Sequence, residues 1–86
     1  MPQYQKDYTD DFKKDVKEIK SDFELQKRLT KKIDEIAENP HHYKPLRNIL
    51  KNKRRVHIGS FVLIFEILEE EKIVVFHTFK HHDEAY

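Results

Sequence analysis

Residues 54–79, which read RRVHIGSFVLIFEILEEEKIVVFHTF, decide the fold. Residues 54–58 alternate polar and apolar side chains, which predicts a strand with one buried face. Residues 61–68 form a nearly continuous run of β-branched and aromatic side chains, as in a central strand buried on both faces. Residues 72–79 repeat that chemistry after an acidic turn. The stretch therefore predicts an antiparallel meander of three strands.

The first strand of this meander also carries polar side chains on a defined face. Val56 and Ile58 point to one side of the strand, and Arg55 and His57 point to the other. The dipeptide Gly59-Ser60 is typical of a turn and separates this strand from the apolar run.

The residues before the meander predict a short strand and two helices. Gln3–Tyr8 is polar and aromatic, as in an edge strand. Thr9 is a suitable N-cap for a first helix. Ser21 and Glu24 form a capping-box pattern that begins a second helix, and Asn39-Pro40 ends it. The apolar positions recur at helical spacing and are expected to pack on the sheet: Phe12, Val16, Ile19, Leu25, Leu29, Ile33 and Ile36.

These elements predict an α+β fold with an N-terminal strand, an αα-hairpin over residues 10–38 and a largely antiparallel sheet. The chain has 86 residues, which is enough for one domain, so we expect residues 1–86 to form a single unit. Residues 41–53 show no usable period, and we expect an irregular segment there.

The composition excludes several classes of protein. The chain has no cysteine, so a disulfide scaffold and a thiolate metal site are excluded. No apolar run reaches the roughly 18 residues of a membrane span, and the N-terminus does not resemble a signal peptide. We therefore expect a cytoplasmic protein without a membrane partner.

The charge is distributed unevenly, although the net charge is only +1. Residues 1–38 carry a net charge of −1, residues 39–65 carry +6 with no acidic residue, and residues 66–86 carry −4. A long acid-free segment in a nearly neutral protein is typical of a surface that binds phosphate groups. A solvated basic loop without a partner is the alternative.

Four motifs, in order along the chain, carry a resemblance to a known family. They are Pro45-Leu46-Arg47, the strand and turn at 54–61, the aromatic strand at 63–67, and the tail at 79–86 that places a basic residue six positions before a tyrosine. Together they resemble the RelE/ParE toxin superfamily over essentially the whole chain.

The resemblance implies the toxin of a type II toxin–antitoxin pair. The RelE branch cleaves mRNA in the ribosomal A site without a metal, adopts a compact α+β ribonuclease fold and is silenced in a hetero-oligomer by a RelB-like antitoxin. The ParE branch instead inhibits DNA gyrase. A catalytically weakened RNA-binding homologue is a third possibility, because Val62 stands where RelE-like sequences commonly have an arginine.

RNA cleavage without a metal needs a base, an acid and cations that stabilise the charge on phosphate. Arg55 and His57 lie roughly 7 Å apart on one strand face and could flank a phosphate. The resemblance adds Lys80, which would stabilise the transition state or protonate the leaving oxygen, and Tyr86, which would stack on or orient a base. We therefore predict these four residues as catalytic. The alternative for Arg55 and His57 is the ordinary polar face of a half-buried strand.

The remaining candidates would position RNA. They are the cations of the basic segment and two histidines of the tail: Lys44, Arg47, Lys51, Lys53, Arg54, His81 and His82. The six histidines suggest no metal site, because His77 and His81 have helical spacing in a sequence that predicts a strand. We expect no cofactor and no metal.

Overall fold

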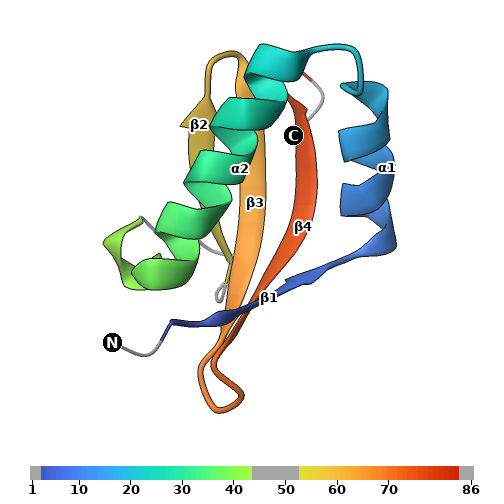
Figure 1. Cartoon of the computed structure of the whole chain (residues 1–86). Coiled ribbons are helices and arrows are strands. Elements are labelled where there is room, and N and C mark those ends of the chain that lie inside the picture. Colours follow the sequence, from blue (N-terminus) through green and yellow to red (C-terminus); the bar gives the residue numbers. More distant parts are fainter. Residues whose placement is uncertain (1–2, 44–52, 84–86) are drawn as a thin grey trace.

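The computed structural model of the chain describes residues 3–43 and 53–83. Figure 1 shows two helices in front of and beside a twisted sheet. In chain order the elements are β1 (Gln5–Tyr8), α1 (Asp10–Glu18), α2 (Phe23–Glu38), the short 3₁₀ helix η1 (Pro40–His42), β2 (Lys53–Ile58), β3 (Phe61–Leu68) and β4 (Ile73–His81). The predicted α+β fold, with its N-terminal strand, helical hairpin and three-strand meander, is confirmed.

The sheet has the strand order β1-β4-β3-β2. Strand β3 pairs antiparallel with both β2 and β4, whereas β1 pairs parallel with β4. The predicted edge position of the N-terminal strand is therefore correct, and the sheet is antiparallel apart from that one pair.

The core lies between the helices and one face of the sheet. Phe65 and Phe76 are completely buried in neighbouring strands, with ring centroids 6.1 Å apart. Helix α2 crosses the sheet in front of β3, and α1 runs beside β4 (Figure 1). The predicted apolar positions of both helices belong to this core, with Val16 at its border.

Some predicted boundaries differ from the structure. Asp22, and not Ser21, is the N-cap of α2, because its Oδ1 accepts a hydrogen bond from the Leu25 amide at 3.1 Å. A carboxylate stabilises the positive end of the helix dipole better than a neutral hydroxyl does. The predicted irregular segment 41–53 contributes to η1 at its start and to β2 at its end.

Strand β4 is longer than β1, and α1 covers the rest of its edge. Strand β1 pairs with residues 73–76. Beyond that point the Thr9 hydroxyl donates to the His77 carbonyl at 2.8 Å, and Asp15 Oδ2 accepts from the Phe79 amide at 2.9 Å. Asp15 Oδ1 accepts from Lys80 Nζ at 2.7 Å. Side chains of α1 and of its N-cap thus provide backbone hydrogen bonds that a longer β1 would otherwise make.

Asp15 is a charged side chain that this arrangement buries to 4% exposure. We expect Asp15→Ala to lower the free energy of unfolding by about 2 kcal/mol, because it leaves the buried Phe79 amide without its acceptor. The ion pair with Lys80 adds little, since the Lys80 side chain is 39% exposed. Urea denaturation measures the difference.

The matched variant Asp15→Asn keeps an oxygen acceptor for the Phe79 amide and should lose clearly less stability than Asp15→Ala. Equal stability of the wild type and Asp15→Ala would show that the edge of β4 does not need this carboxylate.

Candidate functional site

The face of the sheet that points away from the helices carries the predicted catalytic residues that the structure describes. We call it the outer face. Alternation along the strands and the pairing between them assign its members: Lys53, Arg55 and His57 of β2, Val62, Ile64 and Glu66 of β3, and Thr78 and Lys80 of β4.

The register aligns these residues in rows across the sheet. His57 lies opposite Val62, which lies opposite Lys80, and Arg55 lies opposite Ile64. Because neighbouring strands are about 4.8 Å apart, His57 and Lys80 are about 10 Å apart at the backbone. Arg55 and His57 are exposed. The side chains of Arg55, His57 and Lys80 thus originate on one face of the sheet.

The ammonium of Lys80 is oriented by α1. Its hydrogen bond to Asp15 draws it toward the edge of β4, on the side away from β2. The outer face therefore carries Arg55 and His57 on the strand at one edge of the sheet. On the other side it carries Lys80, whose ammonium is held by Asp15. Sequence reasoning missed Asp15, although an acid three residues after Phe12 on the apolar side of α1 is a detectable signal.

Val62 lies between the polar residues of β2 and Lys80 of β4. It lies in the row between His57 and Lys80 and is 1% exposed. The resemblance seen in the sequence predicts an arginine at this position, whereas the side chain found at the centre of the outer face is apolar. The cations Arg55 and Lys80 lie on the strands to either side of β3.

A second ionisable pair lies on the outer face. His77 Nε2 is 2.8 Å from Glu66 Oε1. The pairing of β3 and β4 shifts at Ile64/Phe65, so His77 is an extra residue on β4 that can turn toward Glu66. Sequence analysis missed this pair, because strict alternation does not foresee a bulge.

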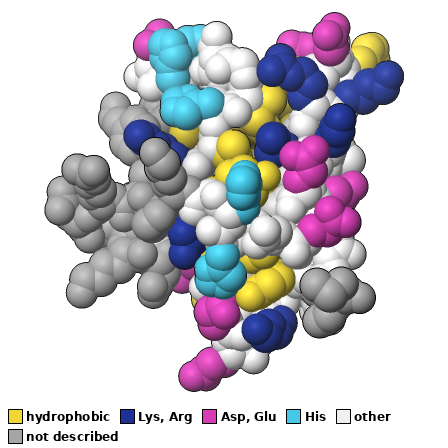
Figure 2. All heavy atoms as spheres, turned by 90° about the vertical axis from the view of Figure 1, so that its left-hand side faces the viewer, with side chains coloured by type: hydrophobic (Ala, Val, Ile, Leu, Met, Phe, Trp, Pro, Cys, Tyr) yellow, Lys and Arg dark blue, Asp and Glu magenta, His cyan; other side chains and the backbone are white. Residues whose placement is uncertain are grey.

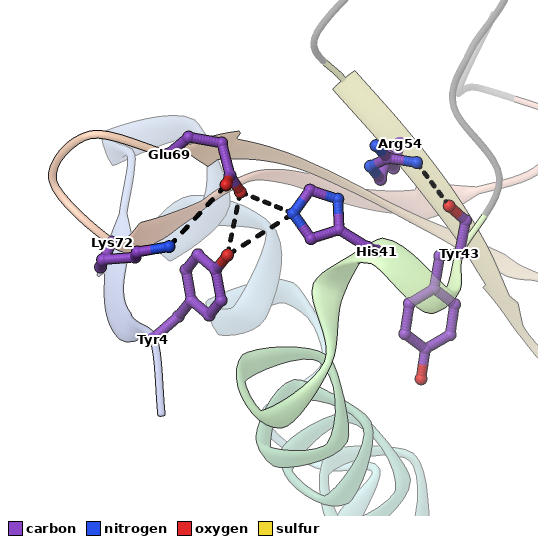
Figure 3. Close-up of polar contacts among 6 residues, drawn as sticks. All are labelled: Tyr4, His41, Tyr43, Arg54, Glu69 and Lys72. Carbon is purple, nitrogen blue, oxygen red and sulfur yellow. Dashed lines mark hydrogen bonds and ion pairs between the residues drawn. The ribbon is translucent and has the colours of Figure 1, made fainter. Parts of the chain in front are cut away.

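The predicted RNA-positioning residues have different surroundings. Lys53 lies on the outer face, whereas Arg54 points to the helix side and donates to the Tyr43 carbonyl at 2.7 Å (Figure 3). His81 and His82 lie at the end of β4. Lys44, Arg47, Lys51 and the predicted catalytic Tyr86 fall outside the described residues.

Figure 2 views the molecule from the side where β2 forms the edge of the sheet. Among the described residues on this side, lysine and arginine side chains lie beside aspartate and glutamate, and histidines lie in several separate places. The described surface on this side therefore has mixed charge. The strongest local concentration of cations in the sequence remains the segment 39–65.

A polar cluster holds η1 against the turn between β3 and β4. Glu69 Oε1 accepts from the Tyr4 hydroxyl at 2.9 Å and lies 2.6 Å from His41 Nε2 (Figure 3). Lys72 lies over the Tyr4 ring, 5.2 Å from its centroid, and 3.9 Å from Glu69 Oε2. The cluster thus joins η1 to the residue before β1 and to the turn between β3 and β4.

The hydrogen bonds from Tyr4 and His41 hold the pKa of the Glu69 carboxyl below its ordinary value of 4.5. A carboxyl whose pKa is lower in the folded state stabilises the fold above its unfolded pKa, and that contribution disappears as the pH falls through the folded pKa. We therefore expect Glu69→Gln to lower the melting temperature at pH 7 and to match the wild type near pH 2.

Glu70→Gln is the matched control, since it removes an exposed carboxylate from the same turn. Thermal melts of the three proteins across pH 2–7 test the cluster. A Glu69→Gln effect that persists undiminished at the acid end would contradict the assignment to the carboxylate.

Comparison with known proteins finds similar sequences and similar folds. Residues 7–86 match the family model described as the ParE toxin of the type II toxin–antitoxin system parDE. A Methanocaldococcus jannaschii protein described as "Putative toxin RelE4" is 50% identical over 68 residues, which are 78% of this chain and 72% of that protein. An uncharacterized protein of Methanosarcina mazei is 42% identical over 76 residues, 87% of this chain and 85% of that protein.

Solved structures share the fold at lower identity. The toxin–antitoxin complex RelBE2 of Mycobacterium tuberculosis contains a chain with a TM-score of 0.82 at 20% identity, covering 93% of this chain and 99% of that one. The isolated RelE toxin of E. coli has a TM-score of 0.77 at 18% identity, covering 91% and 83%. A chain of the E. coli DinJ–YafQ complex has a TM-score of 0.70 at 23% identity, covering 99% of each.

Proposed function

The chain belongs to the RelE/ParE superfamily of toxins of type II toxin–antitoxin systems, and on that premise we propose that it is a ribosome-dependent endoribonuclease that cleaves mRNA. One observation carries the proposal: the register of β2, β3 and β4 gives Arg55, His57 and Lys80 a common face. A cationic sheet face is a suitable support for a ribose-phosphate chain.

The reaction needs no group beyond those of the protein and the RNA. The ribose 2′-oxygen attacks the adjacent phosphorus while a base takes its proton. The bond to the 5′-oxygen then breaks, and an acid supplies a proton to that leaving oxygen. The products are a 2′,3′-cyclic phosphate and a free 5′-hydroxyl. Negative charge grows on the phosphate oxygens during attack, so fixed cations accelerate the step.

The outer-face residues divide these tasks. Arg55 can grip the phosphate through two parallel hydrogen bonds. His57 and Lys80 share the two proton transfers, since an imidazole nitrogen can take a proton and an ammonium can donate one. Lys80 acts as a fixed cation, because its hydrogen bond to Asp15 orients the ammonium before substrate arrives. Tyr86 would stack on a base next to the cleaved bond.

The basic segment would hold the RNA chain beyond the cleaved phosphate. Lys44, Arg47, Lys51 and Lys53 supply charge without base specificity, as phosphate contacts do. His81 and His82 at the end of β4 could extend this surface. Binding should therefore weaken steeply with salt.

The partners follow from the same premise. We propose that a RelB-like antitoxin with an amphipathic acidic segment covers the cationic surface in a hetero-oligomer in the cytoplasm. Support comes from the structural relatives, which include the toxin–antitoxin complexes RelBE2 and DinJ–YafQ. In the helices that the structure describes, no segment is long and apolar enough to cross a membrane.

Inhibition of DNA gyrase is the second candidate. The matching family model is described as a ParE toxin, and the ParE branch of the superfamily is the reason to keep this candidate. The two candidates differ in the fate of mRNA after the toxin is induced.

Primer extension on mRNA after induction tests the proposal. We expect codon-phased cuts in translated transcripts. Arg55→Ala and His57→Ala should each reduce cleavage by about 10²–10⁴-fold, the usual contribution of one acid–base or electrostatic group. Growth arrest should be lost in parallel.

Lys31→Ala is the matched control, because it removes an exposed cation from α2, away from the outer face. It should cut like the wild type. Intact transcripts together with arrested replication would identify a gyrase inhibitor. Harmless expression with retained RNA binding would identify a weakened homologue.

A further inference from the structure

The end of β4 brings three metal-binding side chains together. His81 is the last residue of the strand, and His82 and Asp83 form the following turn. One ligand atom from each of the three lies within 4.8 Å of the others. Neighbouring residues of a regular strand point to opposite faces, which would keep the side chains of His81 and His82 apart. The turn after His81 removes that restriction.

Both imidazoles direct a ring nitrogen toward one carboxylate. His82 Nδ1 is 3.0 Å from Asp83 Oδ1, and His81 Nδ1 is 3.5 Å from Asp83 Oδ2. Zinc binds nitrogen and oxygen ligands at about 2.0–2.2 Å, so two ligand atoms of a tetrahedral zinc site are about 3.4 Å apart. The nitrogen-to-oxygen distances at the end of β4 bracket that value.

The surroundings hold these side chains in place. The His82 amide donates to the Ser60 carbonyl at 2.8 Å, which ties the turn to the β2–β3 connection. The Phe61 ring meets the His81 ring edge-on, with centroids 5.6 Å apart. The Asp83 amide lies 3.3 Å from His81 Nδ1, so the turn brings both the backbone and the side chain of Asp83 to the same imidazole.

We propose that His81, His82 and Asp83 form a surface site for a divalent transition metal, with Zn²⁺ as the simplest occupant. Two imidazoles and one carboxylate suit zinc, nickel or copper better than magnesium or calcium, which prefer oxygen ligands alone. Three protein ligands leave a coordination position for water or a partner's side chain. The site shares His81 and His82 with the proposed RNA surface, but zinc binding does not depend on nuclease activity.

Titration of the purified chain with ZnCl₂ alone, followed by calorimetry and by the histidine ring signals in NMR spectra, tests the site. We expect one equivalent of zinc to bind and to shift the ring signals of His81 and His82. His81→Ala and His82→Ala should each weaken binding at least about tenfold, the range seen when a group that supports a metal is removed. Asp83→Asn should weaken it by a smaller factor.

His42→Ala is the matched control, because it removes another exposed histidine and leaves the end of β4 intact. It should bind zinc like the wild type. Zinc binding that survives both His81→Ala and His82→Ala, or that falls equally in His42→Ala, would overturn the proposal. Circular dichroism of each variant verifies that it is folded, and these exposed or half-exposed positions make that the expected result.

Discussion

The pairing register of β3 decides which side chains share a face of the sheet, and the site depends on it. A shift of one residue would turn Val62 and Ile64 toward the helices and move Leu63 and Phe65 out of the core to the outer face. The present register buries Leu63 and Phe65 completely in the core. The same pairing brings the polar side chains of β2 and β4 to the outer face, so burial of the core and alignment of the cations are one constraint.

The edge of β4 shows how the helices contribute to the site. Helix α1 stands where a longer β1 would pair, and the buried carboxylate of Asp15 serves two purposes. It accepts the hydrogen bond of the Phe79 amide, and it orients the ammonium of Lys80. A structural requirement of the sheet thus fixes a cation proposed to meet the substrate. Stability and the geometry of the site are coupled through one side chain.

Sequence reasoning succeeded where a period or a turn residue carried the information. The two-residue alternation of β2 gave Arg55 and His57 a common face, and the helical spacing gave the apolar faces of both helices. It failed where one residue depends on a distant one. The pair of Glu66 and His77 needs a bulge between two strands, and the contact of Asp15 with Lys80 joins residues 65 positions apart. The N-cap of α2 was misplaced by one residue, because Ser21 and Asp22 are both good caps and only local geometry selects between them.

The central claim is that the outer face binds RNA. The most direct test follows the backbone amide signals of the ¹⁵N-labelled protein in NMR spectra during titration with a short RNA whose 2′-hydroxyls are methylated to prevent cleavage. The account predicts that the largest shifts fall on residues 53–57 of β2 and 78–80 of β4. Shifts confined to the exposed side of α2, with β2 and β4 unaffected, would contradict it.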